Sequence, residues 1–261
     1  MDIISSKDNE IVKKVRKLKE KKYRDLEDSY VIEGIKLIKE AISENANIKQ
    51  IIICDEFADN GIDKETTFEI ARHNVVCVTK NVFNVLTDVK TPQGIIAVVQ
   101  KKNTNIIDYN EDIIIALDDI QDPGNLGTIL RTVDSANLKQ IIVSKNTVDV
   151  YNPKVVRSTM GAIFRVNVIK VDDLKQSLQK ARENEYKVMI TSLEAKKTIY
   201  KTDFNKKIIV IGNEANGVSK EVQELADEKV IIPMLGKTES LNASVATGIM
   251  IYEYVRRKIE G

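Results

Sequence analysis

The last 150 or so residues alternate short apolar runs with amphipathic segments, and this alternation constrains the fold more than any other feature. Residues 113–117 read IIIAL, a run typical of a strand buried on both faces of a parallel sheet. Further strands are expected at 140–143, 165–169, 187–191, 207–211 and 229–232, and helices at 126–136, 153–160, 172–184, 218–226 and 242–259. This order predicts an α/β domain with a mostly parallel sheet covered on both faces.

The first hundred residues show a weaker pattern of the same kind. Helices are expected at 8–22 and 32–44, and strands at 50–53, 75–79 and 94–99. A polar segment then separates the two halves of the chain. We therefore expect a smaller α/β domain over 1–102, a linker over 103–112 and a second domain over 113–261.

Composition bounds the class of protein. The chain is 43% apolar and 30% charged, which suits a globular protein. It shows no leader segment and no apolar run near the length of a membrane span, so we expect a cytoplasmic protein without a membrane partner. Cys54 and Cys77 lie in apolar runs without neighbours at metal-ligand spacing, which favours buried, reduced thiols. Because His73 is the only histidine, we expect no metal site.

The net charge is only +1, but positive charge is concentrated near the N-terminus. Between residues 13 and 24 there are eight basic residues and one acid, Glu20. A positive helical face attracts RNA phosphates whatever the base sequence, whereas the alternative is a solvated face that keeps the helix soluble. We favour RNA contact, with the candidate residues Lys13, Lys14, Arg16, Lys17, Lys21 and Arg24.

Three expected strand ends carry polar, glycine-rich sequence, where ligands of parallel α/β sheets bind. The first is DDIQDPGNLGTILRT at 118–132, in which Pro123-Gly124 makes a turn and Asn125 is suited to cap the next helix. An ordinary strand–helix loop explains the glycine and the asparagine. It does not require Arg131 within an otherwise apolar helix face.

The second strand end is IIVIGNEANGVS at 208–219. Gly212 and Gly217 have the spacing of a phosphate-binding loop, but Val218-Ser219 follows where Lys-Ser/Thr is needed, so this is not that motif. The dinucleotide fingerprint is absent as well. Gly212 permits close backbone approach, and Glu214 places a carboxylate at the end of the strand. The alternative is a plain turn rich in Gly and Asn.

The third strand end is IIPMLGKTESLNASVA at 231–246. Pro233 ends the strand, a loop follows, and either Ser240 or Asn242 can cap the last helix. The small residues that begin this helix permit close packing against another backbone; they are Ala243, Ser244, Ala246 and Gly248.

Taken together, N-L-G-T-I-L-R-T, I-G-N-E-A-N-G-V-S and I-P-M…S-L-N-A-S-V-A resemble the three motifs of the SpoU (TrmH-like) branch of the SPOUT methyltransferases, over about 113–259. The first hundred residues resemble the L30e-like substrate-binding domain of 23S rRNA 2′-O-methyltransferases. That second resemblance depends on E-G at 33–34, T-P-Q-G-I at 91–95 and the basic first helix.

The resemblance implies a deep trefoil knot, a rare exception to unknotted topology, and S-adenosylmethionine as cofactor. It also implies a homodimer formed through the C-terminal domain, in which the partner helps to build the RNA-facing side of the pocket. The implied cofactor-binding residues are Gly212, Ile232, Leu241 and Met234, with Thr191 and Leu193 from the 191–193 turn. The implied catalytic residues are Asn125, Arg131, Glu214, Ser240 and Asn242. One departure is Ala215-Asn216, where many members have a glycine after the glutamate.

Transfer of a methyl group from a sulfonium is an in-line displacement, so most of the catalytic work is positioning. An arginine is effectively always protonated, and it therefore makes a poor base. We expect Arg131 to stabilise a developing alkoxide or to hold the adjacent phosphate, while Glu214 or Ser240 relays the proton.

The expected function is S-adenosylmethionine-dependent 2′-O-ribose methylation of RNA, with 23S rRNA as the expected substrate. One alternative is a tRNA 2′-O-methyltransferase. Another is a non-catalytic RNA-binding or ribosome-assembly protein, although such a protein would not need all five implied catalytic residues. A base methyltransferase of the TrmD-like branch is disfavoured by the G-N-E and S-L-N motifs.

Overall fold

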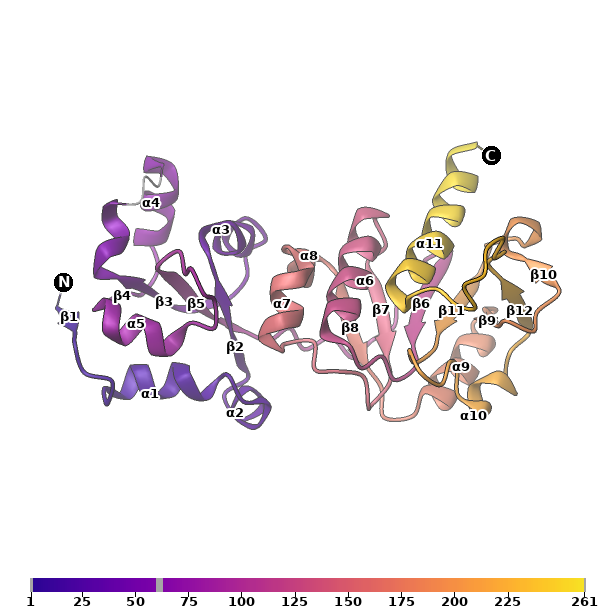
Figure 1. The fold of residues 1–261 in the computed structure, drawn as a ribbon, viewed down its shortest axis with the longest axis horizontal. Helices are drawn as coiled ribbons and strands as arrows, with labels where there is room; N and C mark the ends of the chain where they lie inside the picture. The colour runs from indigo at the N-terminus through magenta and orange to yellow at the C-terminus, as the bar shows by residue number, and fades with distance from the viewer. Residues whose placement is uncertain (1, 60–62, 261) are drawn as a thin grey trace. The chain divides into compact units, whose positions relative to one another are not determined.

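A computed structural model describes residues 2–59 and 63–260 and divides the chain into two compact units (Figure 1). The first unit consists of Met1–Asn103 and Tyr151–Phe164, and the second of Thr104–Val150 and Arg165–Gly261. Both units are α/β, so the predicted fold class is confirmed.

The first unit is built on a five-stranded sheet in the order β1-β4-β3-β5-β2. Its strands are β1 (Ile3–Ile4), β2 (Ser29–Glu33), β3 (Ile48–Cys54), β4 (Val75–Val78) and β5 (Ile95–Gln100). Strand β5 pairs antiparallel with β2 and β3, and the other pairings are parallel. The helices are α1 (Glu10–Lys17), α2 (Lys21–Leu26), α3 (Ile35–Ser43), α4 (Lys64–Ala71), α5 (Lys80–Leu86) and α7 (Pro153–Thr159), with a 3-10 turn η1 (Asp55–Asp59).

The helix predicted at 8–22 is wrong as a single element, because the chain forms α1 and α2 with a turn between them. The cause is Arg24, whose guanidinium donates to the carbonyl oxygens of Leu18 and Lys19 at 2.9 and 2.7 Å. These hydrogen bonds satisfy carbonyl groups at the end of α1, and the helix stops there.

The helix predicted at 32–44 begins too early. Residues 29–33 form β2, which the apolar pattern did not reveal, and Gly34 separates the strand from α3. Helices α4 and α5 were also not predicted, because each is shorter than ten residues. Of the two cysteines, Cys54 is buried and Cys77 is partly exposed; both are free thiols, as predicted.

The second unit is built on a seven-stranded sheet in the order β10-β12-β9-β11-β6-β7-β8, in which every pairing of named strands is parallel. The strands are β6 (Ile113–Leu117), β7 (Gln140–Val143), β8 (Asn167–Lys170), β9 (Lys187–Thr191), β10 (Lys197–Thr198), β11 (Lys207–Ile211) and β12 (Glu228–Ile231). All six predicted strands are confirmed, and four of them, β6, β7, β9 and β11, have the predicted ends. From β6 the chain adds β7 and β8 on one side, and the later strands β9 to β12 lie on the other side, with β11 next to β6. The order of the strands therefore reverses between β6 and β11.

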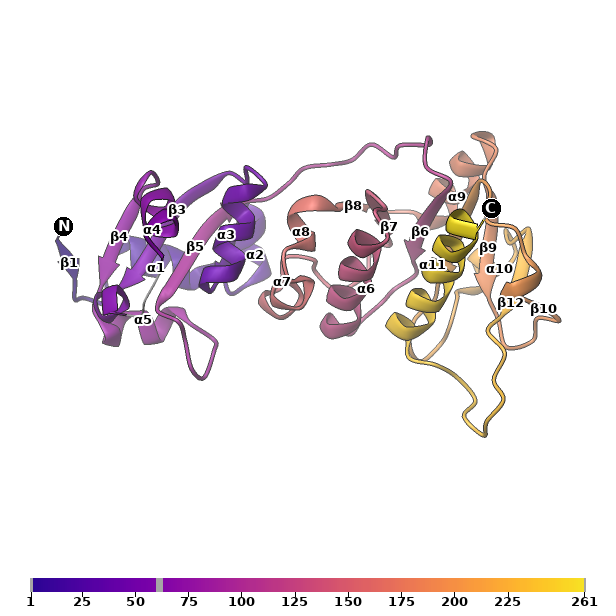
Figure 2. The same cartoon turned by 90° about the horizontal axis from the view of Figure 1, so that it is seen from above.

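Helices cover both faces of this sheet, as predicted. They are α6 (Pro123–Ser135), α9 (Leu174–Glu183), α10 (Lys220–Gln223) and α11 (Ala243–Glu260), with a 3-10 turn η2 (Ile199–Lys201). The helix predicted at 153–160 forms α7 and belongs to the first unit, as do three of the four residues of α8 (Ala162–Arg165). Figures 1 and 2 show α6 and α11 side by side on one face, with α9 on the other. The helix predicted at 218–226 is shortened to the four residues of α10.

The predicted trefoil knot is consistent with this strand order and stays a prediction. Within the part of the chain that the structure describes, no helix is both long and apolar enough to cross a membrane.

Candidate active site

A cavity of about 530 Å³ opens in the second unit where three neighbouring strands end. Its walls come from the turn after β9, the loop after β11 and the segment between β12 and α11. All six predicted cofactor-binding residues line it: Thr191, Leu193, Gly212, Ile232, Met234 and Leu241. Three predicted catalytic residues line it as well, namely Glu214, Ser240 and Asn242. The carboxyl ends of parallel strands are where such sheets bind ligands.

The segment between β12 and α11 offers this cavity a backbone with open hydrogen-bonding groups. Among the described residues, no hydrogen bond engages the main-chain N–H or C=O groups of 232–241. Polar main-chain groups beside apolar side chains such as Ile232 and Leu241 fit a ligand that carries both a purine and charged groups. The cavity therefore suits S-adenosylmethionine in volume and in chemistry.

Gly212 lets the loop after β11 close on itself. A Cβ atom at this position would lie 2.1 Å from the carbonyl carbon of Gly217 and from the nitrogen of Val218. The close approach predicted for Gly212 is thus made by the chain's own backbone. Two main-chain hydrogen bonds of 2.9 Å between Asn213 and Gly217 complete the closed loop, which presents Glu214.

The Glu214 carboxylate is held by donors from the first motif. It accepts from the Asn125 side-chain amide at 2.8 Å and from the backbone N–H groups of Gln121 and Asp122 at 3.2 Å. Burial raises the pKa of Glu214, but donation from Asn125 and from backbone N–H groups outweighs it and leaves the pKa below its ordinary value. Glu214 is therefore an ionised acceptor at neutral pH.

Asn125 joins the three motifs. While its amide group donates to Glu214, its carbonyl oxygen accepts from the Asn242 side-chain amide at 2.9 Å. Asn242 caps α11 as predicted, because its carbonyl oxygen accepts from the Ser244 nitrogen at 2.8 Å. The network fixes the start of α6, the loop after β11 and the start of α11 against one another.

The prediction that Asn125 caps α6 is wrong. Asp122 is the cap, since its carboxylate accepts from the Asn125 nitrogen at 2.8 Å, and Pro123 takes the first helical position. The Asp-Pro pair was the signal that the sequence offered for this cap. Asn125 is buried instead, which frees its side chain for Glu214 and Asn242.

Arg131 is the one predicted catalytic residue that the structure places apart from the others. It lies on the exposed face of α6 and does not line the cavity of its own chain. Across residues 2–59 and 63–260, nothing forms a hydrogen bond or ion pair with its guanidinium. On the same face of α6, Ser135 is 3.1 Å from the hydroxyl of Tyr252 on α11. Arg131 and α11 thus belong to one surface.

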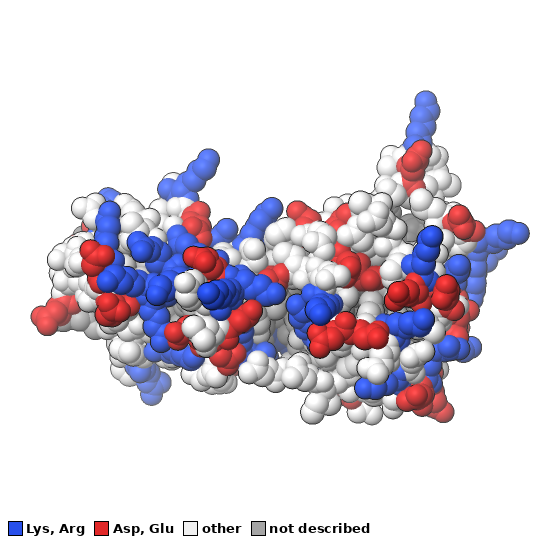
Figure 3. Space-filling view, turned by 90° about the horizontal axis from the view of Figure 1, so that it is seen from below, with Lys and Arg blue, Asp and Glu red and all other residues white. Residues whose placement is uncertain are grey.

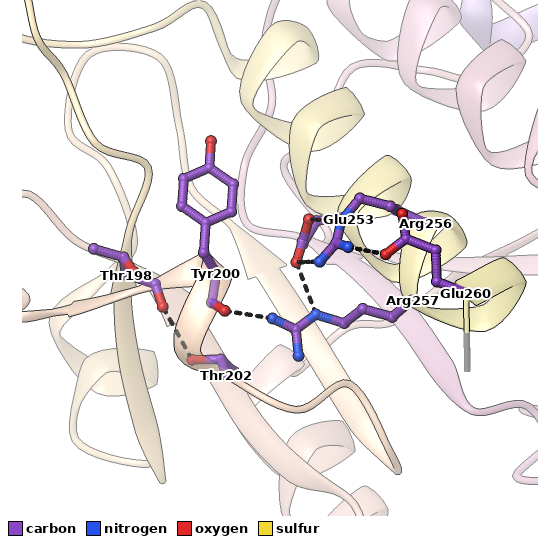
Figure 4. Close-up of polar contacts among 7 residues, drawn as sticks. All are labelled: Thr198, Tyr200, Thr202, Glu253, Arg256, Arg257 and Glu260. Carbon is purple, nitrogen blue, oxygen red and sulfur yellow. Dashed lines mark hydrogen bonds and ion pairs between the residues drawn. The ribbon is translucent and has the colours of Figure 1, made fainter.

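The C-terminal part of α11 carries a buried carboxylate, Glu253, that the sequence did not reveal (Figure 4). Glu253 is buried and accepts from Arg257 at 2.7 Å and from Arg256 at 2.9 Å. Hydrogen bonding to Arg256 and Arg257, despite burial, lowers the pKa of Glu253 to about 2. Arg257 also donates to the carbonyl oxygen of Tyr200 at 2.6 Å, which ties α11 to η2.

The basic residues predicted for RNA binding lie on α1 and α2, and Figure 3 shows Lys and Arg side chains gathered on that part of the first unit. Lys14, Arg16, Lys17 and Lys21 are exposed, and Lys13 is partly exposed. Arg24 does not belong with them, because it is only 3% exposed and its guanidinium is used at the end of α1. We call the other five residues the basic surface.

The cavity has the size of a cofactor and lies where the strand order of a parallel sheet reverses. Its polar motifs are joined by Asn125, and together these features define a transferase-like site of an α/β protein. The model of the SpoU rRNA Methylase family matches residues 112–252, and that of the MRM3-like substrate binding domain matches 9–97. The chain therefore belongs to the SpoU rRNA methylase family, and it is an RNA methyltransferase.

The similarity to relatives and to solved structures extends over nearly the whole chain. It is 30% identical to the 23S rRNA (guanosine(2553)-2′-O)-methyltransferase RlmP of Bacillus subtilis over 97% of this chain and 98% of that protein. The solved AdoMet-bound rRNA methyltransferase from Sinorhizobium meliloti is 30% identical, with a TM-score of 0.87 over 98% of both chains. A solved RNA 2′-O ribose methyltransferase is 25% identical, with a TM-score of 0.84 over 99% of this chain and 100% of that one.

Proposed function

We propose that this protein transfers the methyl group of S-adenosylmethionine to a ribose 2′-hydroxyl of 23S rRNA. The observation that carries the proposal is the network through Asn125, which holds the first motif against the wall of the cavity formed by the other two. The relative RlmP is named for this reaction on 23S rRNA. No feature of the site itself favours tRNA, which stays the alternative substrate.

On the cofactor side, six residues would hold S-adenosylmethionine. Apolar side chains of Leu193, Ile232, Met234 and Leu241 provide walls for the adenine, and the open main-chain groups of 232–241 provide hydrogen bonds. Thr191 and Gly212 complete the site at the ends of β9 and β11. The cofactor supplies an electrophilic methyl group, and the residues supply its position.

On the ribose side, the five predicted catalytic residues divide into two kinds. Asn125, Glu214 and Asn242 are engaged with one another and fix the shape of the site. Ser240 is exposed at the cavity and has no hydrogen bond among the described residues, so it is free to meet the ribose. Because the low pKa of Glu214 makes it a weak base, we assign the proton relay to Ser240 and keep Glu214 as an acceptor.

Arg131 would reach the reaction site from a second copy of the chain. Exposed apolar side chains of α11 recur at seven-residue spacing, at Val245, Tyr252 and Ile259, and therefore share one helix face. The contact between Ser135 and Tyr252 joins that face to the face of α6 that carries Arg131. We propose that this surface forms a homodimer in which each Arg131 stabilises the developing alkoxide in the partner's site.

The first unit would bind the RNA. The match to a substrate-binding domain over 9–97 falls within the proposed domain 1–102. A linker at 103–112 would join this domain to the methyltransferase domain 113–261, of which residues 151–164 cluster with the first unit. The basic surface would neutralise phosphates, a contact that is independent of base sequence. A 23S rRNA substrate implies action in the cytoplasm.

The proposal is tested by incubating the purified chain with methyl-labelled S-adenosylmethionine and 23S rRNA or bulk tRNA. We expect label in 23S rRNA alone, within a dinucleotide that resists alkaline hydrolysis because its 2′-oxygen is blocked. Label that is released as a methylated base from alkali-sensitive nucleotides would refute ribose methylation. Label in tRNA alone would favour the alternative substrate.

A further inference from the structure

A second cavity, of about 210 Å³, lies in the first unit and has no part in the methyl-transfer site. Its walls include Gly34, Leu37 and Gln93 from the N-terminal segment and Arg157 and Met160 from α7 and its end. Gly34 belongs to the E-G sequence and Gln93 to the T-P-Q-G sequence, and the proposed reaction assigns no role to either sequence. The cavity therefore brings together three separate parts of the chain.

The cavity is held open by defined contacts. The Gln93 side-chain oxygen accepts from the Ile35 nitrogen at 2.9 Å, which joins the T-P-Q-G turn to the start of α3. Gly161, at φ +99°, lies so close to α3 that a Cβ atom there would be 2.9 Å from a carboxylate oxygen of Glu40. The end of α7 thus packs against the Glu40 side chain of α3.

Arg157 on α7 and Met160 at its end line the cavity, and neither side chain forms a polar contact there with a residue that the structure describes. Met160 is 41% exposed and has a left-handed backbone, φ 52° and ψ 35°, which is unusual for a residue other than glycine, Asn or Asp. The guanidinium of Arg157 makes no hydrogen bond or ion pair within the described ranges. An apolar thioether and a planar cation at one cavity suit a flat aromatic ligand that carries negative charge.

The position of Arg157 connects the cavity with the basic helix. The same arginine lines a small neighbouring cavity together with Leu18 and Lys19, at the end of α1. Lys36, which is exposed, lines the larger cavity on its α3 side. The carboxylates of Glu33 and Glu40 line it as well, and that of Glu33 accepts from the Thr87 hydroxyl at 2.5 Å. Cations therefore stand at the cavity next to the surface that would follow RNA phosphates.

We propose that this cavity binds one unpaired nucleotide of the RNA substrate, with its base against Leu37 and Met160 and its phosphate at Arg157 and Lys36. Unpaired bases are recognised by such stacking on apolar, aromatic and guanidinium groups, whereas paired bases are not accessible to it. The volume suits one base, being smaller than the ~300 Å³ at which sites for larger ligands begin. The proposal rests on the proposed function in that the ligand is RNA.

The test compares binding of two fluorescent oligonucleotides by anisotropy, a uridine decamer and an abasic decamer of equal charge. The full-length chain is expected to bind the uridine decamer at least about fivefold more tightly, since stacking of a single base accounts for a difference of that size. Met160→Ala should abolish the preference and leave the affinity for the abasic decamer unchanged. Equal affinities of the unaltered protein for both decamers would overturn the proposal.

A matched pair of variants on α7 tests the cation. Arg157→Ala should weaken binding of the uridine decamer by about tenfold, and Lys154→Ala, an exposed basic residue of the same helix that does not line the cavity, by less than about threefold. Equal losses in the two variants would show general charge attraction and refute the site. S-adenosylmethionine affinity by calorimetry should be unchanged in both variants. Because decamer binding needs no methyl transfer, a failure of the proposed reaction would leave this result intact.

Discussion

The side-chain amide of Asn125 donates to the carboxylate of Glu214 over 2.8 Å, although 89 positions separate the two residues. This hydrogen bond joins the helix after β6 to the loop after β11, which are adjacent strands of the sheet. Asn242 adds the start of α11 through its own bond to Asn125. One buried asparagine therefore determines how three motifs meet.

Asn125→Ala should remove both hydrogen bonds and leave the Glu214 carboxylate and the Asn242 amide short of partners. We expect a loss of about 1–3 kcal/mol in the free energy of unfolding. Because the three motifs would shift relative to one another, kcat should fall by about 100-fold. Chemical denaturation and methyl-transfer kinetics measure the two effects.

The control for this variant is Asn184→Ala, at the end of α9, where the side chain bonds only to a carbonyl of its own helix. It should leave kcat unchanged. If Asn125→Ala retained full turnover at temperatures where it is folded, the network would have no catalytic importance.

The low pKa of Glu214 predicts how stability depends on pH. A carboxyl group whose pKa is lower in the folded state stabilises the fold above its unfolded pKa, and this contribution is lost as pH falls through the folded pKa. The difference in unfolding free energy between the unaltered protein and Glu214→Gln should therefore be constant from about pH 6 to pH 8 and shrink below about pH 4.5.

The same pKa predicts that Glu214 contributes no inflection to the pH–rate profile near neutrality. Any inflection of kcat between about pH 6 and pH 8 should persist in Glu214→Gln, at a lower amplitude. Its disappearance in that variant would identify Glu214 as the general base and contradict its assignment as a fixed acceptor.

Arg16 and Arg24 form a pair of variants that separates RNA binding from folding. Arg16→Ala, at an exposed position of α1, should weaken RNA binding and reduce the slope of log K against log salt by about 0.7–0.9, with the free energy of unfolding unchanged. Arg24→Ala should instead lower the free energy of unfolding by about 1–3 kcal/mol and leave the slope unchanged. Identical slopes in Arg16→Ala and the unaltered protein would remove α1 from the RNA interface.

The proposed homodimer predicts complementation between two inactive variants, Arg131→Ala and Asn242→Ala. If Arg131 acts on the partner's site, a mixed dimer keeps one intact site. Random exchange of subunits in an equal mixture of the two variants should then restore about a quarter of the activity of the unaltered protein. Each variant alone sets the background. Activity of the mixture that stays at the background of the two variants would place Arg131 in the site of its own chain, or show that no dimer forms.

The sequence predicted the second unit well because its strands are buried on both faces and read as plain apolar runs. IIIAL at 113–117 is an example, with every residue of β6 buried. The first unit was predicted less well. Its basic helix appears continuous in the sequence, and only the folded chain shows that Arg24 turns inward to end α1 at Leu18.

The set of residues at the cavity was also predictable, whereas their connections were not. Gly212, Ile232 and Leu241 were expected to lie together, and they line one cavity. Nothing in the sequence indicated that Asn125 would be buried between Glu214 and Asn242, because that contact depends on the order of β6 and β11 in the sheet. Glu253 was missed for a different reason: its partners Arg256 and Arg257 lie one turn further along the same helix, but its burial depends on how α11 packs in the fold.

Mapping of ribose methylation across rRNA, in a strain that lacks the gene and in its parent, tests the central claim most directly. The account predicts that one 2′-O-methylated nucleotide of 23S rRNA is lost in the mutant and is restored by the unaltered gene but not by the Arg131→Ala form. Unchanged ribose methylation throughout 23S rRNA, with a methyl group lost from a base or from tRNA instead, would contradict it.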